Sequence, residues 1–414
     1  MKSEKAGIGT RTAAIAITAI LLVGSVIAIY ATMRAGHPIM SSHTTEASPN
    51  SILATSGTRN SGSDSFSSQS SPSLSSLSAN SVTLNLIKMI RLGSATNGPG
   101  MAYDAFHGYL YVENGTNQIS ITVFDTSNDS IIANIRDTNA SGGLLYDPWN
   151  HDVYASQFCT SASTIASLSN YNRYANQLGM GNTLLVLQGK HISKDIYGPC
   201  ANGQLAYDPS DHKIFETANS EDNPVVNVIN DTDNSIMTPI KAIGTFDGPT
   251  GSIAYDSASK LVYVGAGPDV LVVSPETDSV TTSISIESTS GPVINFVGPI
   301  AYNPMNGLVY VSNSLDHGIT EVNGTAVIGN FTQPNYGFAG YSADLTRGIS
   351  FISAYPGIVI AGGLNNTYLL NVTLTGAKQI AYDPTNHHLY VDIQILQGVN
   401  EYSGVAVFST TRTP

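Results

Sequence analysis

Ala301-Tyr302-Asn303-Pro304, followed after three residues by Leu308-Val309-Tyr310-Val311, is the stretch of sequence that decides the fold. The same pattern recurs along the chain: a short apolar run ending in Tyr-Asp, a turn, and an apolar run with a central aromatic residue. Clear copies begin at Met101, Leu145, Ala206, Ala254 and Ala381. A degenerate copy has Ala343-Asp344 in place of Tyr-Asp and Ile349-Ser350-Phe351-Ile352 in place of the second run. Counting it, the spacing is roughly 38–48 residues apart from one longer unit, close to the length of a four-stranded propeller blade.

Each copy has the residue types of β-strands joined by tight turns. The apolar runs are rich in β-branched and aromatic residues. Asp-Pro favours a turn because the Asp side chain bonds backbone N–H groups and Pro presets φ. A third run such as residues 121–124 follows, and residues 125–128 then turn into a fourth run at residues 131–135. The sequence therefore predicts an all-β fold, a seven-bladed β-propeller with four antiparallel strands, A to D from hub to rim, in each blade.

The two ends of the repeat array predict how the ring closes. The last copy has only three strands, the third being Val405-Ala406-Val407-Phe408. Residues 81–90, just before the first copy, have the pattern of an orphan strand D. If they pair beside the last strand C, both open sheet edges disappear. The alternative is that residues 81–90 are only the end of the preceding polar segment.

These copies resemble the YVTN family of β-propeller repeats. The shared pattern is an apolar-Ala-Tyr-Asp-Pro run, then Leu-Tyr-Val, and a later Asp-Thr turn, and it extends over about residues 81–410. The closing Thr-Asn of the family pattern varies here, with Glu113-Asn114, Ser312-Asn313 and Gly265-Ala266 in those places. The resemblance implies the propeller fold and says little about activity.

The N-terminal residues predict an anchor and a stalk. Residues 13–33 are an uncharged apolar run, long enough as a helix to cross a bilayer. Lys2, Lys5 and Arg11 precede it and place residues 1–12 in the cytoplasm. We therefore expect a transmembrane signal-anchor helix at 13–33, a Ser/Thr-rich disordered stalk at 34–80 and the propeller at 81–414. This single-pass arrangement would hold the propeller at the membrane, outside the cell; a signal peptide cleaved near Ala31 or Ala35 is the alternative.

Composition excludes one class of partner and suggests a modification. Charged residues are 11% of the chain and the formal net charge is −13, which argues against nucleic acid because phosphate binding needs clustered Lys and Arg. In an exported chain, Asn-x-Ser/Thr sequons become candidates for glycosylation. The candidates are Asn114, Asn128, Asn139, Asn230, Asn323, Asn330, Asn365 and Asn371.

Strand order assigns the loops to two faces, and the longest loop predicts a binding region. D–A and B–C connections share one face, whereas A–B and C–D turns share the other. The second unit has an insertion between strands B and C, on the first of these faces. We take aromatic, amide and guanidinium groups there as candidate ligand-binding residues, together with two tyrosines from other loops of that face. They are Phe158, Tyr171, Arg173, Tyr174, Asn176, Tyr336 and Tyr402. The alternative is a lid that only covers the central channel.

The two cysteines of the chain, Cys159 and Cys200, both fall on that face of the second blade. In an exported protein this placement predicts a Cys159–Cys200 disulfide. Two free buried thiols are the alternative.

Neither the histidines nor the recurring carboxylates predict a catalytic or metal site. Histidines follow the Tyr-Asp of several copies and fall in A–B turns, where polar turn residues explain them better than a metal does: His107, His151, His212 and His387 with His388. A catalytic group is normally unique, whereas the Tyr-Asp pair is copied from blade to blade. We predict no metal and no cofactor.

The sequence favours a non-enzymatic, membrane-anchored extracellular module for recognition or adhesion. Its expected partners are cell-envelope proteins or glycans. One alternative is a structural component of a surface layer or filament. A second is a lactonase- or lyase-like propeller enzyme with a divalent metal at the hub, which would need Asp, Glu and His converging at one end of the channel.

Overall fold

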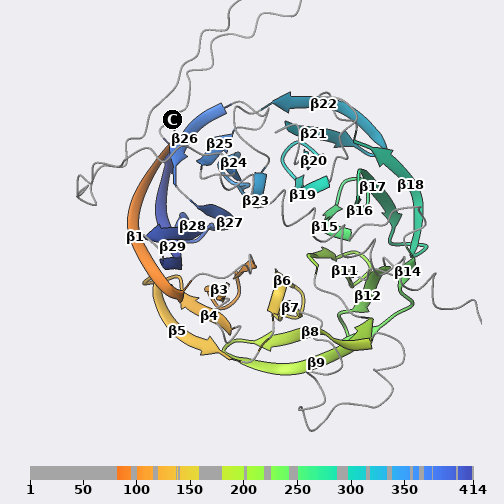
Figure 1. The fold of residues 1–414 in the computed structure, drawn as a ribbon, viewed down its shortest axis with the longest axis horizontal. Helices are drawn as coiled ribbons and strands as arrows, with labels where there is room; N and C mark the ends of the chain where they lie inside the picture. Colours follow the sequence, from red (N-terminus) through yellow and green to blue (C-terminus); the bar gives the residue numbers. More distant parts are fainter. Residues whose placement is uncertain are drawn as a thin grey trace, which may run out of the picture. The chain divides into compact units, whose positions relative to one another are not determined.

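The computed structural model describes residues 82–94, 100–114, 120–136, 138, 140–157, 180–199, 203–218, 225–241, 250–286, 297–313, 318–332, 338–354, 358–362, 368–374, 376–397 and 400–412. All of them belong to the second of two compact units, residues 52–414. The described residues form seven antiparallel sheets arranged around a central axis (Figure 1). We number the sheets as blades in chain order.

The strands of each blade follow one another in sequence from the hub to the rim. Blade 1 is β2 (Met101–Asp104), β3 (Tyr109–Asn114), β4 (Ser120–Asp125) and β5 (Ser130–Ile135). Blade 2 is β6 (Ala140–Tyr146), β7 (Val153–Gln157), β8 (Met180–Gln188) and β9 (His191–Pro199). Blade 3 is β10 (Leu205–Asp208), β11 (Lys213–Ala218), β12 (Val225–Asn230), β13 (Ser235–Ile236) and β14 (Ile240–Lys241). Blade 4 is β15 (Thr250–Asp256), β16 (Leu261–Ala266), β17 (Asp269–Ser274) and β18 (Ser279–Ser285).

The remaining three blades complete the ring. Blade 5 is β19 (Val297–Asn303), β20 (Leu308–Asn313), β21 (Gly318–Asn323) and β22 (Ala326–Thr332). Blade 6 is β23 (Phe338–Asp344), β24 (Ile349–Ala354), β25 (Ile358–Gly362) and β26 (Tyr368–Thr373). Blade 7 is β27 (Ala377–Asp383), β28 (His388–Gln397), β29 (Asn400–Arg412) and, from the other end of the chain, β1 (Val82–Ser94).

The N-terminal strand closes the ring. β1 pairs antiparallel with β29 from Val82 opposite Arg412 to Ser94 opposite Tyr402, with two register shifts. Figure 1 shows β1 as the outermost strand of blade 7, beside β29. Residues 81–90 are therefore not merely the end of a polar segment, because residues 82–90 are all part of this strand.

The predicted fold class needs correction in two respects. Six sheets, not seven, have the predicted four strands; blade 3 has five because its outermost strand is split into β13 and β14, which both pair with β12. Pro239 lies in the split, and proline cannot donate a hydrogen bond to the neighbouring strand. The predicted transmembrane helix is also not part of the observed fold. The described residues contain no helix that could cross a bilayer, and residues 13–33 lie outside them.

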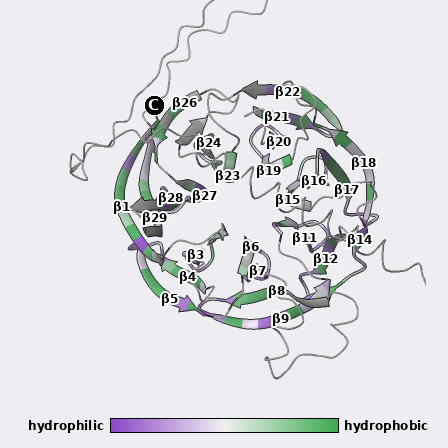
Figure 2. Cartoon of the chain, in the orientation of Figure 1, coloured by the Kyte–Doolittle hydropathy of each residue, from purple (hydrophilic) through white to green (hydrophobic). Residues whose placement is uncertain are grey.

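The apolar core lies between the blades. Seven clusters of buried apolar residues each join two adjacent blades, so every seam of the ring has its own core. Hydrophobic stretches run along strands such as β8 and β17 in Figure 2. Burial of these sheet faces against the next blade is what stabilises the ring, because a single short sheet cannot bury both of its faces.

The A–B turns share one backbone conformation. The residue four positions after the strand A Asp or Asn has a positive φ in each blade: Gly108, His151, His212, Lys260, Gly307, Gly348 and His387. Glycine adopts this left-handed conformation without strain, and His is among the residues enriched there. Three of the histidines that the sequence placed in turns thus hold left-handed turn positions.

Tyrosines on strand B fasten most blades to the next blade. The hydroxyl of Tyr111 donates to the Gly189 carbonyl oxygen at 2.7 Å, and that of Tyr154 donates to Asn234 Oδ1 at 2.7 Å. Tyr263 donates in the same way to the Gly324 carbonyl oxygen. Each acceptor belongs to the C–D turn of the following blade, so these buried hydroxyls fix one blade relative to its neighbour.

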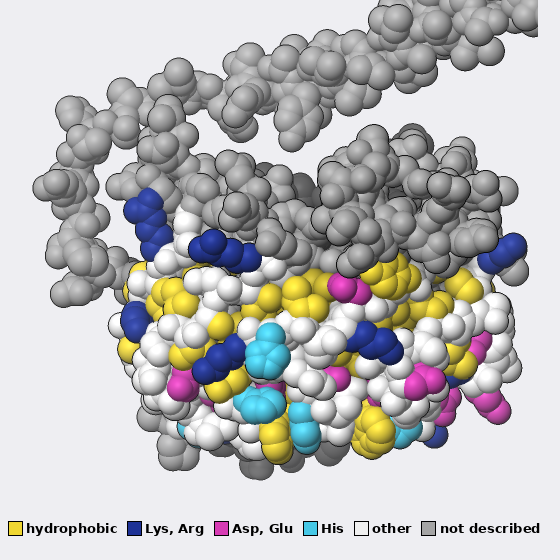
Figure 3. Space-filling view, turned by 90° about the horizontal axis from the view of Figure 1, so that it is seen from below, with side chains coloured by type: hydrophobic (Ala, Val, Ile, Leu, Met, Phe, Trp, Pro, Cys, Tyr) yellow, Lys and Arg dark blue, Asp and Glu magenta, His cyan; other side chains and the backbone are white. Residues whose placement is uncertain are grey.

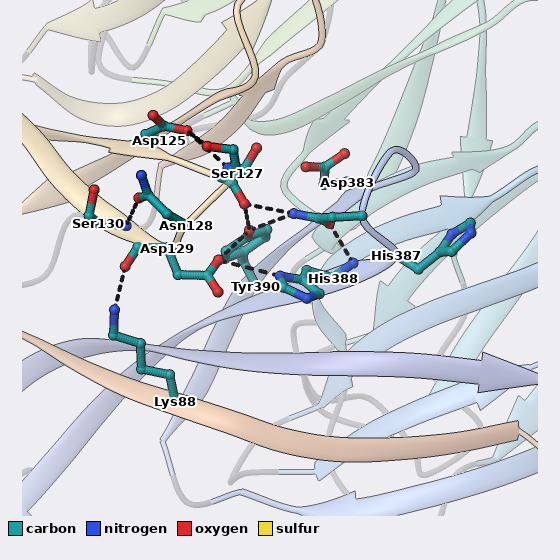
Figure 4. A network of polar contacts seen from close by, with 12 residues as sticks. Lys88, Asp125, Ser127, Asn128, Asp129, Ser130, Asp383, His387, His388 and Tyr390 are labelled. Carbon is teal, nitrogen blue, oxygen red and sulfur yellow. Dashed lines mark hydrogen bonds and ion pairs between the residues drawn. The ribbon is translucent and has the colours of Figure 1, made fainter.

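The same contact joins blade 7 to blade 1 at the point of closure (Figure 4). Tyr390 donates to Asp129 Oδ1 at 2.7 Å, and the His388 ring lies 3.4 Å from the same oxygen. Lys88 Nζ on β1 donates to the Asp129 carbonyl oxygen at 2.7 Å. The ring-closing strand is therefore tied to the first blade by polar contacts as well as by its pairing with β29.

Where strand B has phenylalanine, a cation makes the contact between blades. In blade 3 the aromatic residue is Phe215, and Lys213 Nζ donates to Asp278 Oδ1 of the next blade at 2.8 Å. In blade 6 it is Phe351, and Arg347 Nη1 donates to the Thr410 carbonyl oxygen of blade 7 at 2.9 Å. In blades 3 and 6 a Lys or Arg side chain therefore makes the contact with the next blade that a tyrosine hydroxyl makes in other blades.

The strand A tyrosines reach back to the preceding blade. Tyr103 donates to Asp383 at 2.7 Å, and Tyr382 donates to Asp344 at 2.6 Å. The repeated Tyr-Asp pair is a contact between neighbouring blades, which explains why it recurs from blade to blade.

Candidate binding site

Most residues predicted to bind a ligand lie outside the described residues. These are Phe158, Tyr171, Arg173, Tyr174, Asn176 and Tyr336, and the same holds for Cys159 and Cys200. Tyr402 lies on β29, opposite Ser94 of β1 and Ile395 of β28. The predicted binding loop and the disulfide therefore stay predictions.

The predicted glycosylation sites differ in accessibility. Asn128, Asn323 and Asn330 are exposed, and Asn230 is half-buried. Asn114 is buried, and its amide nitrogen donates to the Leu92 carbonyl oxygen at 3.3 Å. Asn139 and Asn365 lie outside the described residues, and Asn371 lies on β26 opposite Ile360. The exposed sites offer a free path to the side chain, which Asn114 does not.

Two cavities lie at the hub, where the strands A converge. The first, of about 170 Å³, lies at the start of these strands and is lined by residues such as Gly100, Gly143, Gln204 and Gln379. The second, of about 430 Å³, lies at the end of these strands, on the face of the A–B turns. Tyr341 and Leu205 line both cavities, and the Tyr341 ring packs against Tyr310 of blade 5 with ring centroids 6.1 Å apart.

The second cavity, which we call the hub mouth, has an aromatic and aliphatic wall. Its lining includes Tyr207, Tyr255, Tyr302, Tyr341 and Leu345. None of the described residues lining either cavity is Asp, Glu, His or Cys. The wall is suited to a ligand held by ring faces and apolar contact.

The hub mouth lies where the repeat is broken. Blade 6 has Ala343 at the position that holds the Tyr of Tyr-Asp in the other six blades, and Ala343 is part of the lining. Tyr341, two residues before Ala343, pairs with Ile352 of strand B. At the corresponding position the other blades have Met101 or a branched aliphatic residue. Ala343, in the place of the repeat's phenol, and Tyr341 both belong to the lining of the hub mouth.

Carboxylates stand beside the tyrosines of the mouth. Burial, followed by the charges of Asp147 and Asp231, raises the pKa of Tyr207. Burial and the nearby Asp208 raise the pKa of Tyr255 to about 12. Both phenols therefore stay neutral at ordinary pH, with negative charge beside them.

Exposed aromatic side chains surround the A–B turns near the mouth. Phe106 is 64% exposed and stacks on His151 of the next blade, with ring centroids 4.0 Å apart. Trp149 is 54% exposed and meets His212 of the next blade edge-on at 4.6 Å. Figure 3 shows histidines grouped with apolar side chains on the described surface. Together with Leu345, which is 61% exposed, Phe106 and Trp149 make up what we call the turn-face patch.

Carboxyl groups buried in the blades away from the mouth include Glu113, Asp392 and Glu216. Burial, reinforced by the charge of Asp392, raises the pKa of Glu113 to about 8, and burial raises that of Asp392 to about 7. Burial also raises the pKa of Glu216 to about 7, although Thr183, Asn227 and Ser156 donate hydrogen bonds to it. The described residues contain no group of three or more His, Cys, Asp or Glu side chains arranged to hold a metal ion.

Comparison with known proteins supports the fold class and nothing finer. No protein-family model matches the chain, and no curated protein matches it. Among solved structures, it is similar to the crystal structure of Raptor from Chaetomium thermophilum, with a TM-score of 0.57 and 11% sequence identity. The match covers 81% of this chain and 30% of that chain, so this chain corresponds to less than a third of it. The likeness and the ring of repeated sheets define a β-propeller repeat protein.

Proposed function

We propose that this propeller is a recognition module that binds a cell-envelope partner through its A–B turn face. The observation that carries the proposal is the combination of the hub mouth with the turn-face patch, since both lie on the side of the A–B turns. Exposed large aromatic residues beside a concave apolar site are typical of binding surfaces. The resemblance of the repeats to the YVTN pattern is consistent with this reading. The location outside the cell stays a prediction from the N-terminal sequence.

The proposal shifts the expected binding region. The sequence placed it in loops of the opposite face, whereas the described surface offers aromatic side chains and a cavity on the face of the A–B turns. Both cavities at the hub are lined by apolar, glycine, amide and phenol groups. These groups support binding rather than the acid–base chemistry of a hub enzyme.

The test compares two sets of surface variants of the full-length protein. We expect Phe106→Ala, Trp149→Ala and Leu345→Ala combined to weaken capture of envelope glycans or envelope proteins by at least about tenfold, because a few aromatic anchors dominate most interfaces. Ile87→Ala with Met89→Ala is the matched control, since these β1 side chains are also exposed, at 48% and 46%, but lie on the rim. Undiminished capture by the triple variant, on a glycan array and against envelope extracts, would refute the proposal.

A further inference from the structure

We propose that the hub mouth binds an alkylated ammonium or guanidinium group, such as a cationic side chain of a partner protein or a free quaternary ammonium compound. The inference rests on the proposed function, because it names the chemistry that the turn face recognises. Four tyrosines line this cavity of about 430 Å³, which opens on the face of the A–B turns. A cation over the face of such rings is attracted by their quadrupoles, most strongly when it is shielded from water.

The charge around the mouth favours a cation over a neutral ligand. The strands A end in carboxylates in six blades: Asp104, Asp147, Asp208, Asp256, Asp344 and Asp383. Each is at least 98% buried, so their charge is held beside the hub rather than spread into solvent. Carboxylates lie next to Tyr207 and Tyr255, and their negative charge adds to the attraction of the ring faces for a cation.

The cationic side chains of the protein near this face either pair with carboxylates or are exposed to solvent. Arg347 pairs with Asp344 and bonds Thr410, and Lys213 pairs with Asp278 at 2.8 Å. His107 lies 2.6 Å from Asp104. Lys260 and Asp211 are exposed in the A–B turns of blades 4 and 3 and carry opposite charges. An external cation would therefore meet a net negative rim.

The broken repeat gives the inference its structural cause. Ala343 replaces the phenol that would otherwise occupy part of this volume, and Tyr341 brings a ring to a position where other blades have an aliphatic side chain or Met101. Asn303 of blade 5 has also changed: it stands where the other blades have Asp, and its amide donates to Tyr310 at 2.8 Å. The Asp is thus replaced in the one blade whose successor lacks the phenol that would contact it.

The experiment measures binding of choline and of its neutral isostere, 3,3-dimethyl-1-butanol, to the full-length protein by calorimetry and by NMR. The two probes have the same shape and differ in charge. We expect choline to bind about tenfold more tightly, as for a shielded cation over several rings. Peptides carrying trimethyllysine, arginine or glutamine distinguish a protein side chain from a free small cation as the natural ligand.

Two variants locate the binding at the mouth. Ala343→Tyr restores the repeat and should abolish choline binding by filling the cavity, while Tyr341→Ile restores the aliphatic residue and should weaken it at least threefold. Met89→Ala, on the rim strand β1, should leave choline binding unchanged. A thermal melt of each variant checks that it folds. If Ala343→Tyr does not fold, choline binding by Tyr341→Ile is the deciding measurement.

Three results would overturn the inference. They are equal binding of the two probes, no binding of choline at millimolar concentration, and full choline binding by the folded Tyr341→Ile and Ala343→Tyr variants. None of them touches the capture experiment with the turn-face patch. Failure of choline to bind, with capture that still depends on the turn-face patch, therefore rejects this inference alone, whereas undiminished capture by the triple variant rejects the proposed function.

Discussion

The two seams on either side of blade 6 are built in opposite ways. On the side of blade 7, Tyr382 donates to Asp344 at 2.6 Å, and Arg347 bonds both Asp344 and the Thr410 carbonyl oxygen. On the side of blade 5, Ala343 stands in place of the repeat's Tyr and is part of the lining of the hub mouth, which blades 2 to 6 share. Blade 6 is thus fastened by polar contacts at one seam, whereas at the other seam it lacks the repeat's phenol and contributes to the wall of the hub mouth.

The difference between these two seams indicates where a repeat protein can form a binding site. A phenol of strand A recurs in six blades, and three of these phenols, Tyr207, Tyr255 and Tyr302, line the hub mouth. In blade 6 an Ala takes the place of the phenol beside the hub mouth, while the contacts between Asp344, Arg347 and Tyr382 hold the blade against blade 7. Under the proposed function, one end of the blade 6 repeat serves binding and its contacts with blade 7 serve stability.

The largest effect is expected at the fastened seam. Arg347→Ala leaves the carboxylate of Asp344 buried without its cation, which costs about 3–5 kcal/mol in the free energy of unfolding. Lys213→Ala is the matched control, because its partner Asp278 is 26% exposed and such a pair contributes about 1 kcal/mol or less. Denaturant unfolding of both variants measures the difference, and equal losses would show that the two cations are equivalent.

A change of pH distinguishes two buried carboxyl groups, Glu113 and Asp344, because their contributions to the free energy of unfolding change with pH in opposite directions. Glu113, on β3 of blade 1, has a folded-state pKa of about 8, above its unfolded value of 4.5. The folded state binds its proton more tightly, so this contribution to stability is present below pH 4.5 and is lost as the pH rises to 8. It amounts to about 3 kcal/mol between pH 4 and pH 7. Glu113→Gln should flatten this part of the stability profile.

The contribution of Asp344 to the free energy of unfolding changes with pH in the opposite direction. Burial alone would raise its pKa, but hydrogen bonds from Tyr382, Thr346 and Arg347 lower it from 3.8 to about 2. Its contribution is present above pH 3.8 and is lost as the pH falls to about 2. Asp344→Asn should remove that acid-side loss and leave the slope between pH 4.5 and 8 intact. A profile with the same slope in wild type and Glu113→Gln would contradict the assignment of that slope to Glu113.

The blade pattern could be predicted from the sequence because the same physical contact is copied many times. Tyr-Asp and Leu-x-Tyr-Val recur since each blade needs a phenol and an aromatic residue against its neighbour. The ring-closing strand was predictable because residues 81–90 supply the strand that the last copy lacks. The split strand of blade 3 was missed, although Pro239 is the signal for it.

The candidate site was missed for a different reason. Ala343 was visible in the sequence as a departure from the repeat, but a missing phenol has two possible outcomes. Neighbouring side chains can close over the space, or the space can remain. The outcome depends on the positions of Tyr207, Tyr255 and Tyr302 from three other blades, which only the three-dimensional structure supplies. A break in a repeat therefore locates a candidate site, whereas its shape requires the ring.

The smallest effect compares two tyrosines that hold the same place in neighbouring parts of the ring. Tyr382→Phe removes a 2.6 Å hydrogen bond to a buried carboxylate and should cost about 2 kcal/mol in the free energy of unfolding. Tyr302→Phe removes only a 3.4 Å contact with Ser257 and should cost about 0.5 kcal/mol or less. Because phenylalanine keeps the ring that lines the mouth, Tyr302→Phe should also retain choline binding. A loss at Tyr302 as large as that at Tyr382 would mean that the contact between blades 4 and 5 is as strong as the contact between blades 6 and 7, against this prediction.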